Sequence, residues 1–168
     1  VFSLVSDAVG RTSNSVPVGI SINDVWANYT TNDEGSETSV SFEALTDGYA
    51  DTLGYINSGY ADFIIVKADG SLSSQSMPFE EVAGWWDRQA QSAGVPMMID
   101  HINEKICTDS TGWGSPDELV KQVIKADDYS SYIGSIFNSL SALDANTEES
   151  TSVLVKHYND QIDREGLN

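Results

Sequence analysis

The sequence is poor in cationic residues. It has 8 Lys and Arg against 26 Asp and Glu in 168 residues, which gives a formal net charge of -18 and a pI near 4.1. A nucleic-acid-binding surface needs Lys and Arg to displace the counterions of the phosphates, so this balance excludes nucleic acid as a partner. The sequence also lacks any apolar run near the roughly 18 residues of a membrane-spanning helix, and it therefore predicts no transmembrane segment.

Cysteine is almost absent as well. Cys107 is the single cysteine, so the chain has no internal disulfide. The ordinary interpretation is a buried packing residue. The alternative is an intermolecular disulfide from Cys107 to a second chain, which would suit a protein cut from a longer precursor. No local pattern around Cys107 indicates a catalytic thiol.

The familiar short catalytic and nucleotide-binding motifs are missing. The sequence contains no G-x-S-x-G nucleophile motif, no phosphate-binding P-loop and no G-x-G-x-x-G segment. We therefore expect no nucleotide cofactor, and no other cofactor is predicted. These absences favour a protein without catalytic activity.

The composition predicts a folded and secreted protein. Hydrophobic residues make up 40% of the chain and aromatic residues 10%, which is enough for a core. No Pro-, Gly- or charge-rich linker divides the sequence, so residues 1–168 are expected to form a single domain. The acidic, Ser-rich composition and a start at Val1 without an initiator Met are typical of a processed extracellular protein. The sequon Asn28-Tyr29-Thr30 predicts a glycosylation site at Asn28.

The order of hydrophobic patterns predicts an α+β fold. Alternating apolar residues predict a strand near 16–22, and the segments 61–67 and 71–77 resemble a hairpin around an Asp-Gly turn. Residues 1–15 are expected to form an extended arm or an edge strand. Helix-start signals then follow one another, at Pro78, Pro96 and Ser115. We therefore expect a small, mostly antiparallel sheet packed against helices, with a helical C-terminal half.

The two histidines lie in similar segments, DHINEK (100–105) and KHYND (156–160). Each places an acid three residues after the histidine, so the four residues His101, Glu104, His157 and Asp160 are candidate metal ligands. If 96–107 is a helix, however, the histidine of the first segment projects away from the apolar stripe. The more ordinary interpretation is therefore two solvent-exposed, salt-bridged histidines.

A tryptophan pair next to acidic residues provides the raw material of a sugar site. A glycosidase needs two carboxylates of unlike pKa beside aromatic platforms. The candidate catalytic residues are Glu80, Glu81 and Asp87, and the candidate binding residues are Trp85, Trp86 and Trp113. The competing interpretation is that the tryptophans belong to the core.

Taken together, these patterns favour a secreted, acidic, non-catalytic binding protein of the effector or toxin-like class. Such a protein would be one chain of a processed precursor, active at acidic pH, with a cell-surface glycan or protein as its target. Relief of carboxylate repulsion would then make it more stable in acid than at neutral pH. One alternative is a small secreted enzyme, either carbohydrate-active around the tryptophan pair or metal-dependent through the histidines. Another is a structural subunit of a surface assembly.

Overall fold

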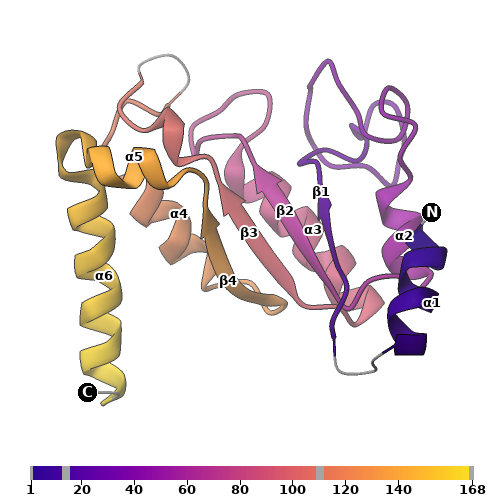
Figure 1. The fold of residues 1–168 in the computed structure, drawn as a ribbon. Helices are drawn as coiled ribbons and strands as arrows, with labels where there is room; N and C mark the ends of the chain where they lie inside the picture. Colours follow the sequence, from indigo (N-terminus) through magenta and orange to yellow (C-terminus); the bar gives the residue numbers. More distant parts are fainter. Residues whose placement is uncertain (1, 13–15, 109–111, 167–168) are drawn as a thin grey trace.

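A sheet of four parallel strands forms the centre of the molecule (Figure 1). The computed structural model describes residues 2–12, 16–108 and 112–166. The strands are side by side in sequence order, each parallel to the next. They are β1 (Gly19–Ile22), β2 (Phe63–Ala68), β3 (Met97–His101) and β4 (Tyr132–Phe137). The fold is therefore α/β, and the expectation of an α+β fold with a mostly antiparallel sheet is wrong.

Helices connect the strands and cover one face of the sheet. Because all strands point the same way, each connection must cross back along the sheet, and a helix is the usual crossover. Contacts join α2 to α3, α3 to α4 and α4 to α6, so the helices form a layer of neighbours. In chain order, the helices are α1 (Phe2–Thr12), α2 (Thr52–Asn57), α3 (Phe79–Ala93), η1 (Asn103–Lys105), α4 (Glu118–Ala126), α5 (Leu140–Ala145), η2 (Thr147–Glu149) and α6 (Ser150–Glu165).

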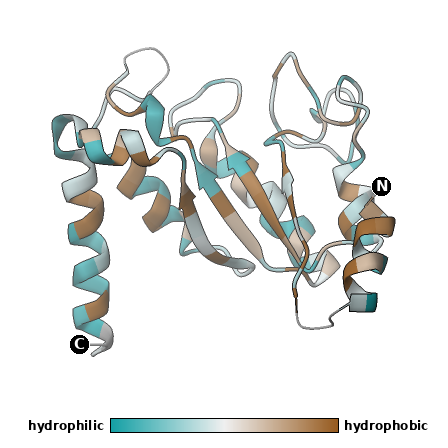
Figure 2. Cartoon of the chain, viewed as in Figure 1, coloured by the Kyte–Doolittle hydropathy of each residue, from teal (hydrophilic) through white to brown (hydrophobic). Residues whose placement is uncertain are grey.

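Alternation along β2 separates the two faces of the sheet. Ile64, Val66 and Ala68 are buried, whereas Phe63 and Ile65 are half-buried and Lys67 is exposed. Side chains on a strand point alternately to opposite faces, so the buried set faces the helices and the other set faces the front of Figure 1. Both sets contain apolar residues, and the strands accordingly appear largely hydrophobic in Figure 2.

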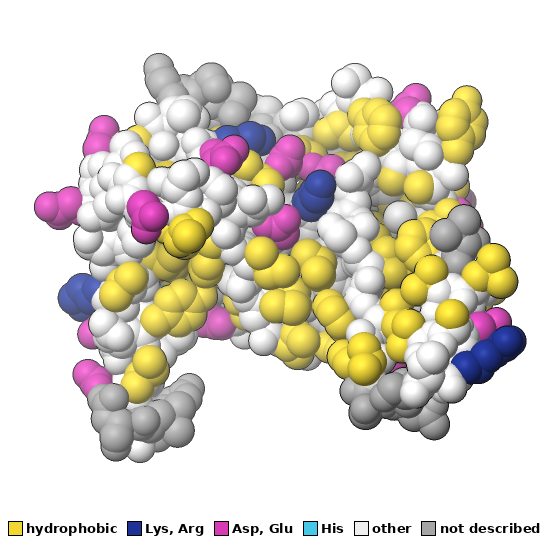
Figure 3. All heavy atoms as spheres, in the orientation of Figure 1, with side chains coloured by type: hydrophobic (Ala, Val, Ile, Leu, Met, Phe, Trp, Pro, Cys, Tyr) yellow, Lys and Arg dark blue, Asp and Glu magenta, His cyan; other side chains and the backbone are white. Residues whose placement is uncertain are grey.

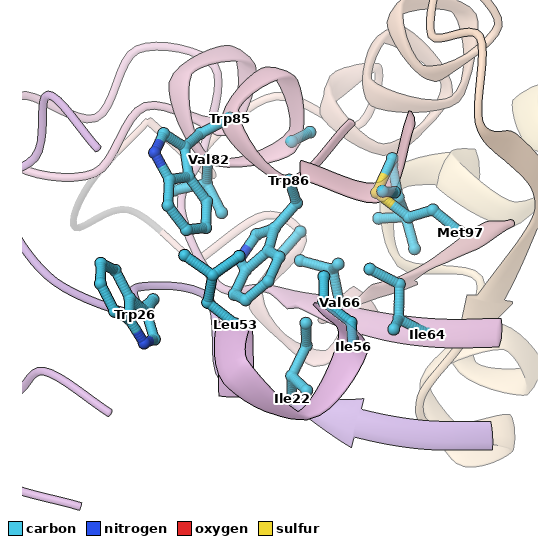
Figure 4. Packing of buried hydrophobic residues seen from close by; sticks show 14 of the residues in the cluster. Ile22, Trp26, Leu53, Ile56, Ile64, Val66, Val82, Trp85, Trp86 and Met97 are labelled. Atoms are coloured by element: carbon cyan, nitrogen blue, oxygen red, sulfur yellow. The ribbon is translucent and has the colours of Figure 1, made fainter. Parts of the chain in front are cut away.

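The main core lies between the sheet and the helix layer. Figure 4 shows Trp86 of α3 pointing among Ile22, Ile56, Ile64 and Val66. Its ring is fully buried and packs edge-on against Trp85, with 4.7 Å between ring centroids. A smaller second cluster lies under α4 and α6; its buried members are Ile106, Trp113, Leu119, Val123 and Leu154.

Residues 71–77 do not form the predicted second strand of a hairpin. Within the described part of the chain they are turns and bends that lead from β2 into α3. Gly70 is needed for a close approach, because a Cβ atom there would lie 1.8 Å from the backbone oxygen of Met77. Phe79 N then donates to Ser71 O at 3.0 Å and closes the loop. The Asp-Gly pair thus begins a strand-to-helix loop.

Two segments of the half that was expected to be helical are strands in the structure. The segment after Pro96 forms β3, and the segment after Asp128 contains β4. A short apolar run cannot be assigned to a helix or a buried strand from periodicity alone, since both faces of β3 carry apolar side chains. Residues 2–12, predicted as an arm or edge strand, form α1, where Phe2 packs against Tyr55; residues 1 and 13–15 lie outside the described residues.

Candidate functional site

The carboxyl ends of β1, β2 and β3 bring five charged side chains to one edge of the sheet. In parallel α/β sheets this edge is where ligands bind, because the loops after the strands meet there. The five residues are Asp24, Lys67, Asp69, Asp100 and Lys105, and we refer to them as the carboxyl-edge cluster. The charge of Asp69 acts on the carboxyls of both Asp24 and Asp100, Lys105 acts on Asp24 and Lys67 acts on Asp100, so Asp69 links the two carboxyls electrostatically.

The open face of the sheet leads up to this cluster. Its half-buried apolar side chains come from three strands: Phe63, Ile65, Met98 and Ile136. Figure 3 shows hydrophobic side chains gathered in the middle of this face, with acidic and basic side chains above them. The site thus combines an apolar floor with a charged rim, a combination that suits ligands with both apolar and hydroxyl-rich surfaces.

Asp100 is the least satisfied member of the carboxyl-edge cluster. It is 7% exposed, and its Oδ1 has no hydrogen-bond partner among the described residues. The strand register places it directly beside Lys67 on β2 and Ile136 on β4. Burial raises the pKa of the Asp100 carboxyl above its ordinary value, Lys67 opposes this increase and Asp69 adds to it. A buried acceptor without a partner is costly, so its presence here requires a reason.

Asp24 is held in place by the core beneath it. The Trp86 indole N–H donates to the Asp24 backbone oxygen at 2.7 Å, and the Asp24 Oδ1 accepts from Val25 N at 3.0 Å. Burial raises the pKa of the Asp24 carboxyl; the Val25 N–H opposes this effect, Asp69 adds to it and Lys105 opposes it. A second protonatable carboxyl therefore lies at the same edge.

Lys105 and Asp69 form the ion pair of the carboxyl-edge cluster. The Lys105 Nζ lies 3.6 Å from the Asp69 Oδ2 and donates to the Asp69 backbone oxygen at 3.0 Å. The same ammonium group lies 5.9 Å from the centre of the Trp113 ring, within cation–π range. Asp69 keeps 45% of its side chain exposed, so its carboxylate remains accessible to a ligand.

His101 follows Asp100 but points to the opposite face. It is fully buried between Phe79 and Phe137, whose rings lie 5.8 Å and 5.4 Å from its own. Its Nδ1 lies 3.0 Å from the Gln122 Oε1 and its Nε2 2.8 Å from the Ser135 hydroxyl. An amide oxygen only accepts, so Nδ1 carries the proton. Burial lowers the pKa of His101 to about 4, and the imidazole is neutral near pH 7.

The other candidate metal ligands lie apart from His101. Glu104 accepts from the Ser139 hydroxyl at 2.9 Å, and Asp160 pairs with Lys156 at 2.6 Å on α6. His157 is also on α6, beside Tyr158. The prediction that both histidines are solvent-exposed is wrong for His101. Within residues 2–12, 16–108 and 112–166, no three His, Cys, Asp or Glu side chains are grouped to hold a metal ion.

The predicted catalytic carboxylates all have partners on the helix side of the molecule. Glu80 pairs with Lys125 at 3.3 Å, and Glu81 accepts from the Glu37 N at 2.8 Å. Asp87 accepts from both the backbone N and the hydroxyl of Ser131, at 2.8 Å and 2.5 Å. These residues connect α3 to the surrounding loops, and they lie on different elements from the carboxyl-edge cluster.

The tryptophans proposed as sugar platforms are core residues. Trp85, Trp86 and Trp113 are 4%, 0% and 1% exposed, respectively. The Trp85 indole N–H donates to the Glu34 backbone oxygen at 3.1 Å, and its ring stacks on Trp26. Their contribution to a site is therefore indirect, through support of Asp24 and Lys105.

Asn28 and Cys107 are the remaining predicted sites. Asn28 is 4% exposed, and its Nδ2 donates to the Val40 O at 3.0 Å and to the Glu43 Oε1 at 2.6 Å, so a glycan on that nitrogen would disrupt a buried network. Cys107 is half-buried, and burial followed by the charge of Glu148 raises the pKa of its thiol. An intermolecular disulfide at this position stays a prediction.

Sequence patterns alone did not identify the carboxyl-edge cluster. Each of its aspartates follows or ends an apolar run: ISIND, IIVKAD and MMID. That recurrence is the signal of parallel strands ending at one edge, and it becomes readable only once all three runs are recognised as strands.

Comparison with known proteins found a similar protein with a named activity. The chain is similar to a glycosyl hydrolase. It is 29% identical over 132 residues to the protein named "Glycosyl hydrolase YngK" from Bacillus subtilis (strain 168). The matched region is 78% of this chain and 26% of that protein, so the chain spans about a quarter of the length of this curated relative. No protein-family model matches the chain.

This similarity favours the carbohydrate-active alternative over the non-catalytic binding protein as an interpretation of the sequence. In the structure, however, the candidate residues of that alternative are core residues or form contacts between elements. In the described part of the chain, no helix is long and apolar enough to cross a membrane.

Proposed function

We propose that the chain carries a glycoside-cleaving site at the carboxyl edge of its sheet. The observation that carries this proposal is the buried Asp100 Oδ1, which has no hydrogen-bond partner among the described residues and belongs to a carboxyl beside Lys67 on which Asp69 also acts. Glycoside hydrolysis uses two carboxyl groups in different environments, one that gives a proton and one that carries negative charge. Asp100 and Asp69 differ in this way, since one is buried without a partner and the other is half-exposed in an ion pair.

The architecture supports this location. Four strand–helix units in sequence order, with their helices on one face, correspond to one half of an eight-stranded β/α barrel. Catalytic residues of such barrels come from the carboxyl ends of several strands. The relative named as a glycosyl hydrolase is about four times as long as the matched region, so it has chain available for further units. In a complete barrel of this kind, the face that carries the apolar side chains in Figure 3 would be the inner face.

The test is a panel of oligosaccharides of different sugar type and linkage, followed both by NMR and by product analysis. We expect one class to shift the backbone resonances of residues 24, 69 and 100, and its glycosidic bond to be cleaved. Asp69→Asn should lower the rate by about 10²–10³-fold, the range for loss of one group that stabilises charge in the transition state. Asp128→Asn is the matched control, because that side chain is 70% exposed in an ion pair with Lys125. No resonance shift at these residues with any sugar would refute the proposal.

A further inference from the structure

Asp100 occupies a position that binding alone does not explain. A carboxylate that only accepts hydrogen bonds from sugar hydroxyls can remain hydrated in the free protein, as Asp69 does with 45% of its side chain exposed. Asp100 is instead 7% exposed with one oxygen buried and unpartnered in the described part of the chain. Such an environment disfavours the charged form and favours the neutral acid.

The surroundings of Asp100 can be enumerated from the strand register. On β2 its neighbour is Lys67, and Asp69 lies two residues further along the chain. On β4 its neighbour is Ile136, which carries no charge. On its own strand, Ile99 and His101 point to the helix face. One cation and one anion therefore act on the Asp100 carboxyl, whose neighbour on β4 is apolar.

Resting on the function proposed above, we propose that Asp100 donates the proton to the leaving-group oxygen, with Lys67 controlling when it holds that proton. The bond between the anomeric carbon and the glycosidic oxygen breaks as the Asp100 proton moves to that oxygen, and the bonding electron pair leaves with it. The leaving sugar departs as a neutral alcohol and Asp100 becomes a carboxylate. Water then supplies a hydroxyl group to the anomeric carbon and returns a proton to Asp100, which completes the hydrolysis.

Asp69 and Lys67 have complementary roles in this scheme. Asp69, accessible and paired with Lys105 at 3.6 Å, faces the positive charge that develops on the sugar ring. Lys67 limits the protonation of Asp100, since an adjacent cation favours the carboxylate. Burial thus raises the pKa of Asp100 and Lys67 lowers it. The balance between the two effects sets the pH range in which Asp100 can donate a proton.

Substrates with good and poor leaving groups distinguish a loss of proton donation from a loss of binding. The sugar alkoxide released from an oligosaccharide is a poor leaving group and needs the proton. The 2,4-dinitrophenolate ion is a good leaving group and departs without it. For Asp100→Asn we expect a loss of roughly 10²-fold or more on the oligosaccharide and less than about 10-fold on the dinitrophenyl glycoside of the same sugar. Lys67→Met should shift the alkaline limb of the wild-type rate profile to higher pH. Asp128→Asn is the control for both measurements, and circular dichroism checks that each variant is folded.

Each result bears on a different step. A leaving-group-dependent loss together with the upward shift of the limb supports the assignment. An equal loss on both substrates, or no loss on either, overturns Asp100 as proton donor while the glycoside-cleaving site stands. Sugar binding by the wild type without any cleavage also overturns the donor and leaves a carbohydrate-binding site. An unmoved alkaline limb in Lys67→Met overturns the role of Lys67. Absence of sugar binding by the wild type refutes the site itself, and the donor with it.

Discussion

The adjacent β3 residues His101 and Asp100 lie on opposite faces of the sheet and differ in how well their polar groups are hydrogen-bonded. His101 faces the helices, where both ring nitrogens have partners and two aromatic rings enclose it. Asp100 faces the open side and has a buried oxygen with no partner among the described residues. Most buried polar groups in proteins have a hydrogen-bond partner, because an unpaired group costs free energy. The unsatisfied oxygen of Asp100 lies on the uncovered face, and this is where we propose that a ligand binds.

The hydrogen-bond network around His101 also explains how the open face keeps its shape. Its Nε2 accepts from Ser135 on β4, whose hydroxyl lies 2.7 Å from the Tyr132 hydroxyl. On the other side, Gln122 donates to the Glu118 Oε1 at 3.0 Å, and that oxygen accepts from the Leu72 N at 2.7 Å. Three segments are thereby fixed relative to β3. A rigid helix face is what allows the open face to present its charges in a defined arrangement.

The largest expected contrast between the faces is in packing. Trp86→Ala removes a fully buried ring from the core and should lower the free energy of unfolding by about 3–5 kcal/mol. Ile65→Ala on the open face, where the side chain is half-buried, should cost about 1 kcal/mol. Urea unfolding of both variants measures the difference. If Ile65→Ala proved as costly as Trp86→Ala, the open face would have to be covered in solution, and self-association would be measured next.

The second contrast is in the dependence of stability on pH. The pKa of His101 is about 4 in the folded chain, below its ordinary value of 6.5, so between these pH values the unfolded chain binds a proton that the folded chain does not. The stability contribution of neutral His101 is therefore fully present above pH 6.5 and is lost as the pH falls towards 4. The loss amounts to roughly 3 kcal/mol at 1.36 kcal/mol per pKa unit. This effect opposes the acid stabilisation expected from the many carboxylates.

Thermal unfolding from pH 7 to pH 4 tests the histidine effect. His101→Gln should flatten the dependence of stability on pH in this interval, and its stability at pH 7 should fall because the aromatic stack is lost. His157→Gln, which changes the only other histidine, is the matched control. A wild-type protein that becomes more stable throughout this interval would show that relief of carboxylate repulsion outweighs the burial of His101.

The smallest expected effect on stability comes from Asp100→Asn, which should stabilise the protein, whereas the preceding variants should destabilise it. The raised pKa of Asp100 means that its charged form destabilises the folded state once the pH exceeds its ordinary value of 3.8. Asp100→Asn should therefore raise the free energy of unfolding at pH 7 by about 1 kcal/mol, and the gain should vanish below pH 3.8. Asp62→Asn provides the comparison, because the Asp62 Oδ2 accepts from the Val18 N at 2.7 Å and its loss should destabilise. If urea unfolding showed that both variants change the free energy of unfolding in the same direction, this result would contradict the proposed difference between the two aspartates.

Several local elements were predictable from the sequence. The helix predicted to open at Pro78 is α3, and it ends at Gly94, which adopts a left-handed φ of 70°. The strand predicted near 61–67 is β2, and the alternating segment 16–22 contains β1. These predictions succeeded because proline, glycine and alternation act over a few neighbouring residues. The segment around Met97–His101 failed, since Ile99, Ile102 and Ile106 at helical spacing imitate an amphipathic helix.

The sequence by itself determined the acidity of the protein and its scarcity of Lys and Arg that could bind phosphate, because both follow from composition. It also determined where several helices and strands begin or end, because these positions follow from local backbone preference. Only the tertiary structure decided that the strands are parallel, that Trp85 and Trp86 are core, and that Asp24, Asp69 and Asp100 meet at one edge. Strand direction depends on which segments pair across the sheet. A site built from three strand ends exists only after that pairing has formed.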